Sequence, residues 1–202
     1  FLLTALVAPG LLLPDIRNNG LPLYFSRPVS KPIYLAGKLF VLVAVQSAVT
    51  WAPMLLLFFF QSGLEGGTWI FVHFDIMVAI LGGSLAWILI ISLLALAVSS
   101  MVRWKAAGSA LLLGVVFISS GMGEAVNEIF QTRWGTIFNL IYMFEKIWEW
   151  IFSYNAAGNV IVVPANEAPY LPLPVYLLVL VVIALACVGL LWRKIRAFEV
   201  VK

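Results

Sequence analysis

The chain has 202 residues, of which 63% are hydrophobic and only 10% are charged. Soluble globular proteins have about 45–50% apolar and about 25% charged residues, so this chain has too little polar surface to coat a water-soluble particle. The composition therefore excludes the soluble, disordered and disulfide-scaffold classes, and it predicts an integral membrane protein. The net charge of +3 is too small for a nucleic-acid surface, and Cys187, the single cysteine, excludes an intrachain disulfide.

The first apolar segment, residues 1–14, is shorter than the ~20 residues that span a bilayer. We expect it to be the second half of a transmembrane helix whose first half would precede Phe1. Pro14 and Asp15 are predicted to end this helix. A mixed segment follows at 15–38, with four basic residues, one acidic residue and three prolines.

Four later segments are long and apolar enough to be spans, at residues 39–61, 76–102, 106–122 and 173–192. They contain no Asp, Glu, Lys or Arg. Because ion- and proton-driven carriers use charges at membrane depth, this absence argues against such a carrier. Together with the partial first helix, the segments predict an all-α polytopic helical bundle, a single transmembrane domain over 1–202 with about five spans in this chain.

The outer region 123–172, between the last two spans, contains an aromatic-rich stretch at 136–153 that admits two interpretations. It is either a further span or an amphipathic helix that lies on the membrane or re-enters it. Polar side chains recur there at helical spacing, at Asn139, Lys146, Glu149 and Ser153. We favour the amphipathic helix and expect Trp148, Glu149 and Trp150 on it, with the tryptophans at the headgroup level.

The distribution of charge predicts the topology. Placing the loop 15–38 in the cytoplasm brings ten of the twelve basic residues to that side, including those of the tail 193–202. Seven of the nine acidic residues then lie outside. This arrangement obeys the positive-inside rule, whereas a span at 136–153 would move the basic tail to the outside.

Most catalytic signatures are absent from the sequence. It contains no GxxxxGK[ST] loop, HExxH, CxxC or GxSxG motif. His73, the lone histidine, is interpreted as a polar residue at the outer membrane face rather than a metal ligand. Cys187 lies in an apolar run, as an inert buried thiol does. We therefore expect no catalytic residue, cofactor or metal on this chain.

The most informative segment is the loop 15–38, with the sequence DIRNNGLPLYFSRPVSKPIYLAGK. Its apolar patch and its prolines describe a short, stiff element that suits the docking of a soluble partner. An ordinary loop lying on lipid headgroups is an equally open alternative. Ser30 is placed to cap a helix that begins within 31–38.

This loop resembles the first cytoplasmic loop of type 2 permeases of ATP-binding-cassette (ABC) exporters. The matching positions are Asp15, Arg17, Gly20, Leu21, Leu23, Tyr24, Ser26, Arg27, Pro28, Ser30, Tyr34, Gly37 and Lys38. The segment 190–201 is similar to the end of the family's last helix. The middle of the chain matches the family only in hydropathy.

The resemblance implies a permease half of six transmembrane helices, paired with a second half that is a copy or a relative. Separate ATPase subunits would hydrolyse the ATP, and export would be the direction. The segment 15–30 would be the coupling element on the ATPase, shaped by Arg27 and Pro28, with Arg17 paired to an acidic residue there. Contact with anionic lipid is the alternative role for both arginines. We expect the bacterial inner (cytoplasmic) membrane as the location.

A rival function stays open beside the permease. The chain could be a membrane anchor or scaffold subunit of a larger complex that transports nothing. An intramembrane enzyme has no support, because no paired carboxylates, serine–histidine pair or metal cluster lie at membrane depth in the sequence.

Overall fold

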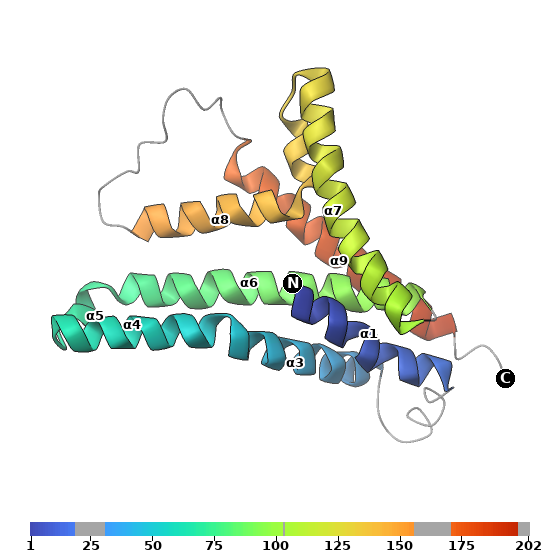
Figure 1. Ribbon diagram of the computed structural model, residues 1–202, viewed down its shortest axis with the longest axis horizontal. Helices are drawn as coiled ribbons and strands as arrows, with labels where there is room; N and C mark the ends of the chain where they lie inside the picture. Colours follow the sequence, from blue (N-terminus) through green and yellow to red (C-terminus); the bar gives the residue numbers. More distant parts are fainter. Residues whose placement is uncertain (19–30, 103, 156–170, 198–202) are drawn as a thin grey trace. The chain divides into compact units, whose positions relative to one another are not determined.

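The computed structural model describes residues 1–18, 31–102, 104–155 and 171–197. These ranges are helical and contain no strand, which confirms the all-α prediction. The helices in chain order (Figure 1) are α1 (Leu2–Arg17), α3 (Lys31–Val49), α4 (Trp51–Glu65), α5 (Trp69–Val72), α6 (Phe74–Met101), α7 (Lys105–Phe130), the 3₁₀ helix η1 (Trp134–Phe138), α8 (Leu140–Asn155) and α9 (Leu173–Ala197).

Four helical stretches of the described chain are long and apolar enough to cross a membrane. They are Pro32–Glu65, Phe74–Met101, Lys105–Phe130 and Leu173–Lys194. Each contains most of one predicted span, and Leu2–Asp15 is the shorter apolar helix expected at the beginning of the chain. The chain is therefore an integral membrane protein with transmembrane helices, as its composition predicts.

The helix boundaries next to two prolines, Pro14 and Pro53, differ from the prediction. α1 continues through Pro14 to Arg17 instead of ending at Pro14. Pro14 lacks the N–H that would bond to the carbonyl of Gly10, four residues earlier, and membrane helices tolerate proline where neighbouring groups satisfy the freed carbonyl.

The predicted span 39–61 is two helices, α3 and α4, separated at Thr50. Pro53 costs α4 no backbone hydrogen bond, because in the first turn of a helix its missing N–H needs no partner. The proline ring would instead clash with a backbone carbonyl if α3 and α4 were one uninterrupted helix, which explains a break directly before it.

The described chain forms two compact units. Unit 1 comprises Phe1–Gln46, Ile88–Ile118 and Val179–Lys202, and unit 2 comprises Ser47–Trp87 and Ser119–Leu178. The helices α3, α6, α7 and α9 contribute residues to both. Charge follows the same division, because the sequence of unit 1 has ten basic and two acidic residues, a net charge of +8. Unit 2 has two basic and seven acidic residues, a net charge of −5.

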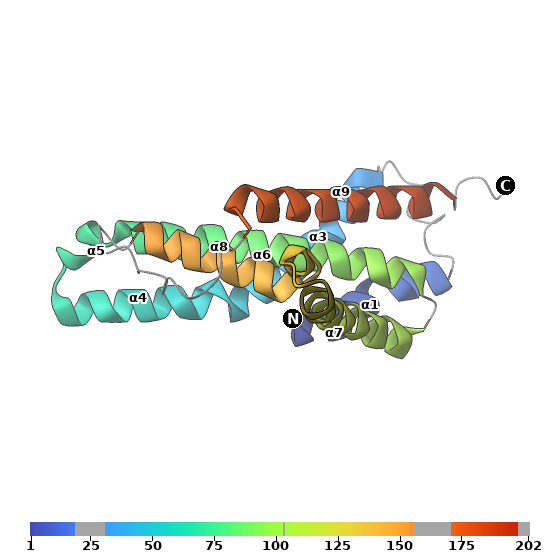
Figure 2. The ribbon, with the colours of Figure 1, turned by 90° about the horizontal axis from the view of Figure 1, so that it is seen from above.

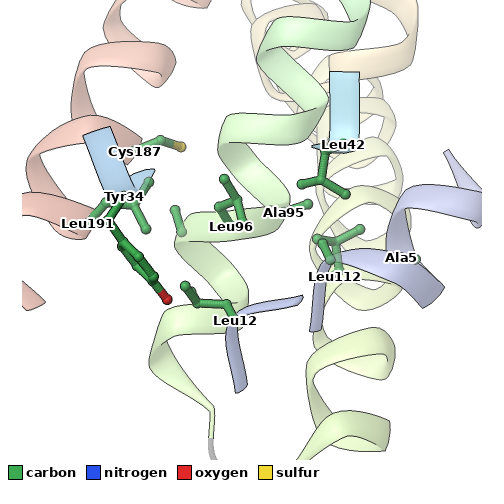
Figure 3. Packing of buried hydrophobic residues seen from close by; sticks show 11 residues of the cluster. Ala5, Leu12, Tyr34, Leu42, Ala95, Leu96, Leu112, Cys187 and Leu191 are labelled. Atoms are coloured by element: carbon green, nitrogen blue, oxygen red, sulfur yellow. The ribbon is translucent and has the colours of Figure 1, made fainter. Parts of the chain in front are cut away.

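The core of unit 1 brings together apolar side chains of α1, α3, α6, α7 and α9 (Figure 3). They include Ala5, Leu12, Tyr34, Leu42, Ala95, Leu96, Leu112, Cys187 and Leu191. Gln46 Nε2 of α3 donates to Ser92 Oγ of α6 across 2.7 Å, and both side chains are buried. The pair satisfies polar groups between two apolar helices, the joining role expected of such residues in spans.

The core of unit 2 includes one face of α8. The buried side chains recur at helical spacing, at Leu140, Met143, Phe144 and Ile147. Phe144 packs edge-on against Trp87 of α6, with ring centroids 4.6 Å apart, and α8 runs beside this part of α6 (Figure 2). α8 is therefore amphipathic as predicted. Its placement on or within the membrane stays a prediction.

The beginning of α8 differs from the predicted polar stripe. Asn139 precedes the helix, and its Oδ1 accepts the backbone N–H of Tyr142 across 3.0 Å. This is the geometry of a side-chain N-cap. Asn139 thus starts the helix instead of lying on its polar face.

Candidate functional site at the base of the first polar loop

The structure describes the two ends of the predicted coupling element. Arg17 is the last residue of α1, and Tyr34 lies in the first turn of α3. The residues between them that carry most of the motif lie outside the described ranges: Gly20, Leu21, Leu23, Tyr24, Ser26, Arg27, Pro28 and Ser30. The capping role predicted for Ser30 lies outside them as well, whereas the helix expected within 31–38 does begin at Lys31.

Asp15, Tyr34 and Lys38 meet where the loop leaves α1 and enters α3. Tyr34 Oη donates to Asp15 Oδ2 at 2.7 Å, and Lys38 Nζ lies 2.7 Å from the same oxygen in a salt bridge. Lys38 also donates to the Leu11 carbonyl. We call these three side chains the loop clamp, because they join the last turn of α1 to the first turns of α3.

The side chains of the loop clamp are mostly shielded from solvent. The side chains of Lys38 and Asp15 are only 20% and 16% exposed, and Tyr34 belongs to the buried core of unit 1. A salt bridge on an open surface contributes only about 0–1 kcal/mol. Removing one partner of a fully buried pair costs about 3–5 kcal/mol, because the other charge is left without a counterion, and this partly buried pair lies between the two limits. The clamp is therefore a firm attachment rather than an incidental surface pair.

The sequence predicted part of this arrangement. Asp15 and Tyr34 were both expected at the coupling element, and the structure brings them into direct contact. Lys38 belonged to the motif without an assigned role. Its signal was present, since Tyr34 and Lys38 are four residues apart on one face of a helix and Asp15 is the one acid in the segment 15–38. The bond from Lys38 to the Leu11 carbonyl had no signal in the sequence.

The residues predicted on the amphipathic helix do lie on α8, but in different surroundings. The Trp148 ring lies against Gly83 of α6, where a Cβ added to the glycine would be 3.2 Å from it. Trp150 is half exposed. Glu149 Oε2 accepts a hydrogen bond from Lys146 Nζ at 2.8 Å. Of the two tryptophans, Trp150 is thus the more exposed one.

The polar face of α8 also perturbs two protonation equilibria. Burial raises the pKa of Tyr142 to about 12. Burial alone would lower the pKa of Lys146, but its hydrogen bond and attraction to Glu149 raise the pKa above the usual lysine value. Lys146 Nζ also lies 5.4 Å from the centroid of the Tyr142 ring. Lys146 is accordingly charged, and Tyr142 neutral, at physiological pH.

His73 belongs to an aromatic cluster. Its ring stacks on Trp69 with centroids 4.3 Å apart, and its Nδ1 is hydrogen-bonded to the Trp69 carbonyl at 3.1 Å. Trp69 in turn packs against Phe58 of α4. Within the ranges that the structure describes, no three His, Cys, Asp or Glu side chains come together as a metal site.

Comparison of the chain with protein-family models, with curated proteins and with solved structures gives no match in any of the three. The loop motif and the loop clamp are therefore the features of the chain that bear on its function.

Proposed function

We propose that the chain is the permease subunit of an ABC transporter and moves its substrate with ATP hydrolysed by a separate ATPase subunit. The loop clamp is the observation that supports this most. It joins both ends of the segment that resembles the coupling loop, through Asp15 on one side and Tyr34 and Lys38 on the other.

A coupling element has to convey displacement to helices. A loop with loose ends would absorb a push from an ATPase in its own backbone torsions. With the clamp in place, a force on residues 18–30 reaches α1 and α3 together, as rigid-body motion of packed helices. Because Tyr34 and Lys38 of α3 both bind the Asp15 carboxylate of α1, the two helix ends would move together.

Charge supports an orientation for this permease. We assign the basic loop 15–38, the turn at 103–105 and the tail 193–202 to the cytoplasmic side, in agreement with the positive-inside rule. The loop then faces the compartment that holds ATP. The complex would contain a second permease half and two ATPase subunits in a bacterial inner membrane, and it would act as an exporter.

Co-purification tests the proposal directly. The protein is extracted from its native membrane in mild detergent, and its partners are identified by mass spectrometry. A stoichiometric soluble subunit with a GxxxxGK[ST] motif is expected. Its reproducible absence, with a different complex in its place, would overturn the proposal and make the chain an anchor.

A charge reversal in the loop gives a second readout. In the reconstituted complex, Arg27→Glu should lower the ATP hydrolysis that the permease stimulates, because the loop would no longer match its docking surface. Arg133→Glu, a matched reversal in unit 2, should leave that activity unchanged. Equal activity of both variants would contradict a coupling role for the loop, and an anchor subunit would have no such activity to lose.

A further inference from the structure

Unit 1 contains a cavity between the last turn of α6 and the last turns of α9. It is lined by Ser100 and Met101 of α6 and by Leu190, Arg193 and Lys194 of α9, and its volume is about 260 Å³. It is open to its surroundings. From these residues we propose that the cavity binds the phosphate headgroup of an anionic phospholipid.

The lining combines one apolar wall with two cations. Met101 and Leu190 are both exposed apolar side chains beside the cavity. Arg193 and Lys194 supply the charge, and no salt bridge joins either of them to an acidic side chain in the part of the chain that the structure describes. Ser100 Oγ donates to the Ala97 carbonyl of its own helix (2.7 Å) and so keeps an oxygen lone pair rather than a second donor. The anion would thus be held by the arginine and the lysine.

The height of the cavity in the membrane fits a headgroup. The candidate spans end at Met101 and at Lys194, so both walls of the cavity lie at the end of a transmembrane stretch. Trp104 and Trp192 are exposed at the same helix ends, and tryptophan concentrates at the membrane–water interface. Basic side chains near helix ends extend toward phosphates there, and basic pockets between transmembrane helices are sites for anionic headgroups.

The negative ends of two helix dipoles work against this site. α6 ends at Met101 and α9 at Ala197, and each helix carboxyl end carries about −0.5 of an elementary charge. These partial charges decay within one turn. Arg193 and Lys194 carry two full positive charges, and the only described acid of unit 1, Asp15, is committed to the loop clamp. The net field in the cavity is therefore positive.

The size of the cavity limits what enters it. Pockets that enclose a drug-sized ligand occupy about 300–1,000 Å³. The lower end of this range is slightly above the volume of this cavity. A phosphate with its glycerol fits within that volume, whereas two acyl chains do not. The chains would lie along the exposed apolar surface that Met101 and Leu190 begin.

Native mass spectrometry of the detergent-solubilised chain tests this site. Phosphatidylglycerol and phosphatidylcholine with identical acyl chains are added in turn, and inorganic phosphate is added as a separate competitor. We expect phosphatidylglycerol to bind more tightly, and phosphate not to displace it. Displacement by phosphate at millimolar concentration would overturn the lipid assignment in favour of a soluble anion, and equal binding of the two lipids would overturn the site.

Variants locate the binding. Arg193→Gln and Lys194→Gln should each weaken phosphatidylglycerol binding about five-fold, the factor expected for one basic residue near an anionic lipid surface. Lys105→Gln removes an exposed charge of the same unit that does not line the cavity, and it should leave the affinity unchanged. An equal loss in all three variants would show diffuse attraction and contradict the site.

A steric variant completes the test. Leu190→Trp keeps every charge and fills the cavity, so it should abolish the preference for phosphatidylglycerol over phosphatidylcholine. Thermal unfolding of each variant verifies that it is folded. These measurements need no ATPase, so their outcome is independent of the proposed transport function.

Discussion

Asp15 illustrates how much a single residue determines in this chain. Its Oδ2 atom accepts from Tyr34 and faces Lys38. In the sequence it stands beside Pro14, which predicted the end of a helix. The helix continues to Arg17, and Asp15 lies on its last turn, where it reaches α3. Local sequence rules could not anticipate this, because the partners are 19 and 23 residues further along the chain.

The loop clamp makes a prediction about stability. Tyr34→Phe removes one hydrogen bond to a charged acceptor, which should lower the free energy of unfolding by about 1.5–3 kcal/mol. Lys38→Met leaves Asp15 without its counterion. Because the pair is partly buried, the cost should lie between the about 1 kcal/mol of an exposed pair and the about 3–5 kcal/mol of a buried one. Thermal unfolding in detergent measures both.

A double-mutant cycle tests whether the pair acts as a unit. Asp15→Asn combined with Lys38→Met should cost clearly less than the sum of the two single changes, because no unpaired charge is left. Additive effects would show that the two side chains do not interact in the folded protein.

At the scale of the helices, hydropathy predicted the four spans, and polar side chains at helical spacing within an aromatic-rich stretch predicted α8. The ends of the helices were harder to predict from the sequence. α7 continues to Phe130 rather than ending at Met122, because a helix that leaves the apolar core can carry Glu124 and Glu128 in its last turns without desolvating them. The break at Thr50 depends on Pro53, which hydropathy does not weigh.

The contact between α1 and α7 depends on a glycine. A Cβ added to Gly108 would lie 3.1 Å from Cβ of Pro9, a rigid ring that cannot move aside. Gly108→Ala should therefore destabilise the protein by about 1–3 kcal/mol, as overpacking does. Gly121 of the same helix has open space around it. Gly121→Ala should be neutral or stabilise by up to about 1 kcal/mol, and equal losses at both positions in thermal unfolding would contradict this packing.

Two tryptophans of α8 should respond differently to truncation. Trp148 packs on Gly83, whereas Trp150 is half exposed. Trp148→Ala should destabilise the folded protein by about 2–4 kcal/mol, and Trp150→Ala by less than about 1 kcal/mol. Tryptophan fluorescence during denaturant unfolding reports both. A larger loss for Trp150→Ala would mean that the membrane-facing side of α8, rather than its contact with α6, stabilises it.

At the scale of the whole molecule, the charges predict sidedness. α6 crosses the membrane by length and composition, so the turn before it and the turn after it face opposite compartments. In a Cys187→Ser background, Trp104→Cys should react with a membrane-impermeant maleimide only after the cells are opened. Gly66→Cys should react in intact cells. The reverse pattern would contradict the proposed orientation.

In the proposed bacterial inner membrane, the transmembrane voltage would act on the unequal charges at the two ends of the spans. Each elementary charge that crosses 100 mV changes the electrical free energy by about 2.3 kcal/mol. In the proposed orientation, ten of the twelve basic residues lie on the electrically negative side and seven of the nine acidic residues on the positive side. An inverted chain would have both groups of charges against the field. Respiration would thereby favour correct insertion of each new copy, and an uncoupler added during synthesis should increase the inverted fraction while leaving finished copies in place.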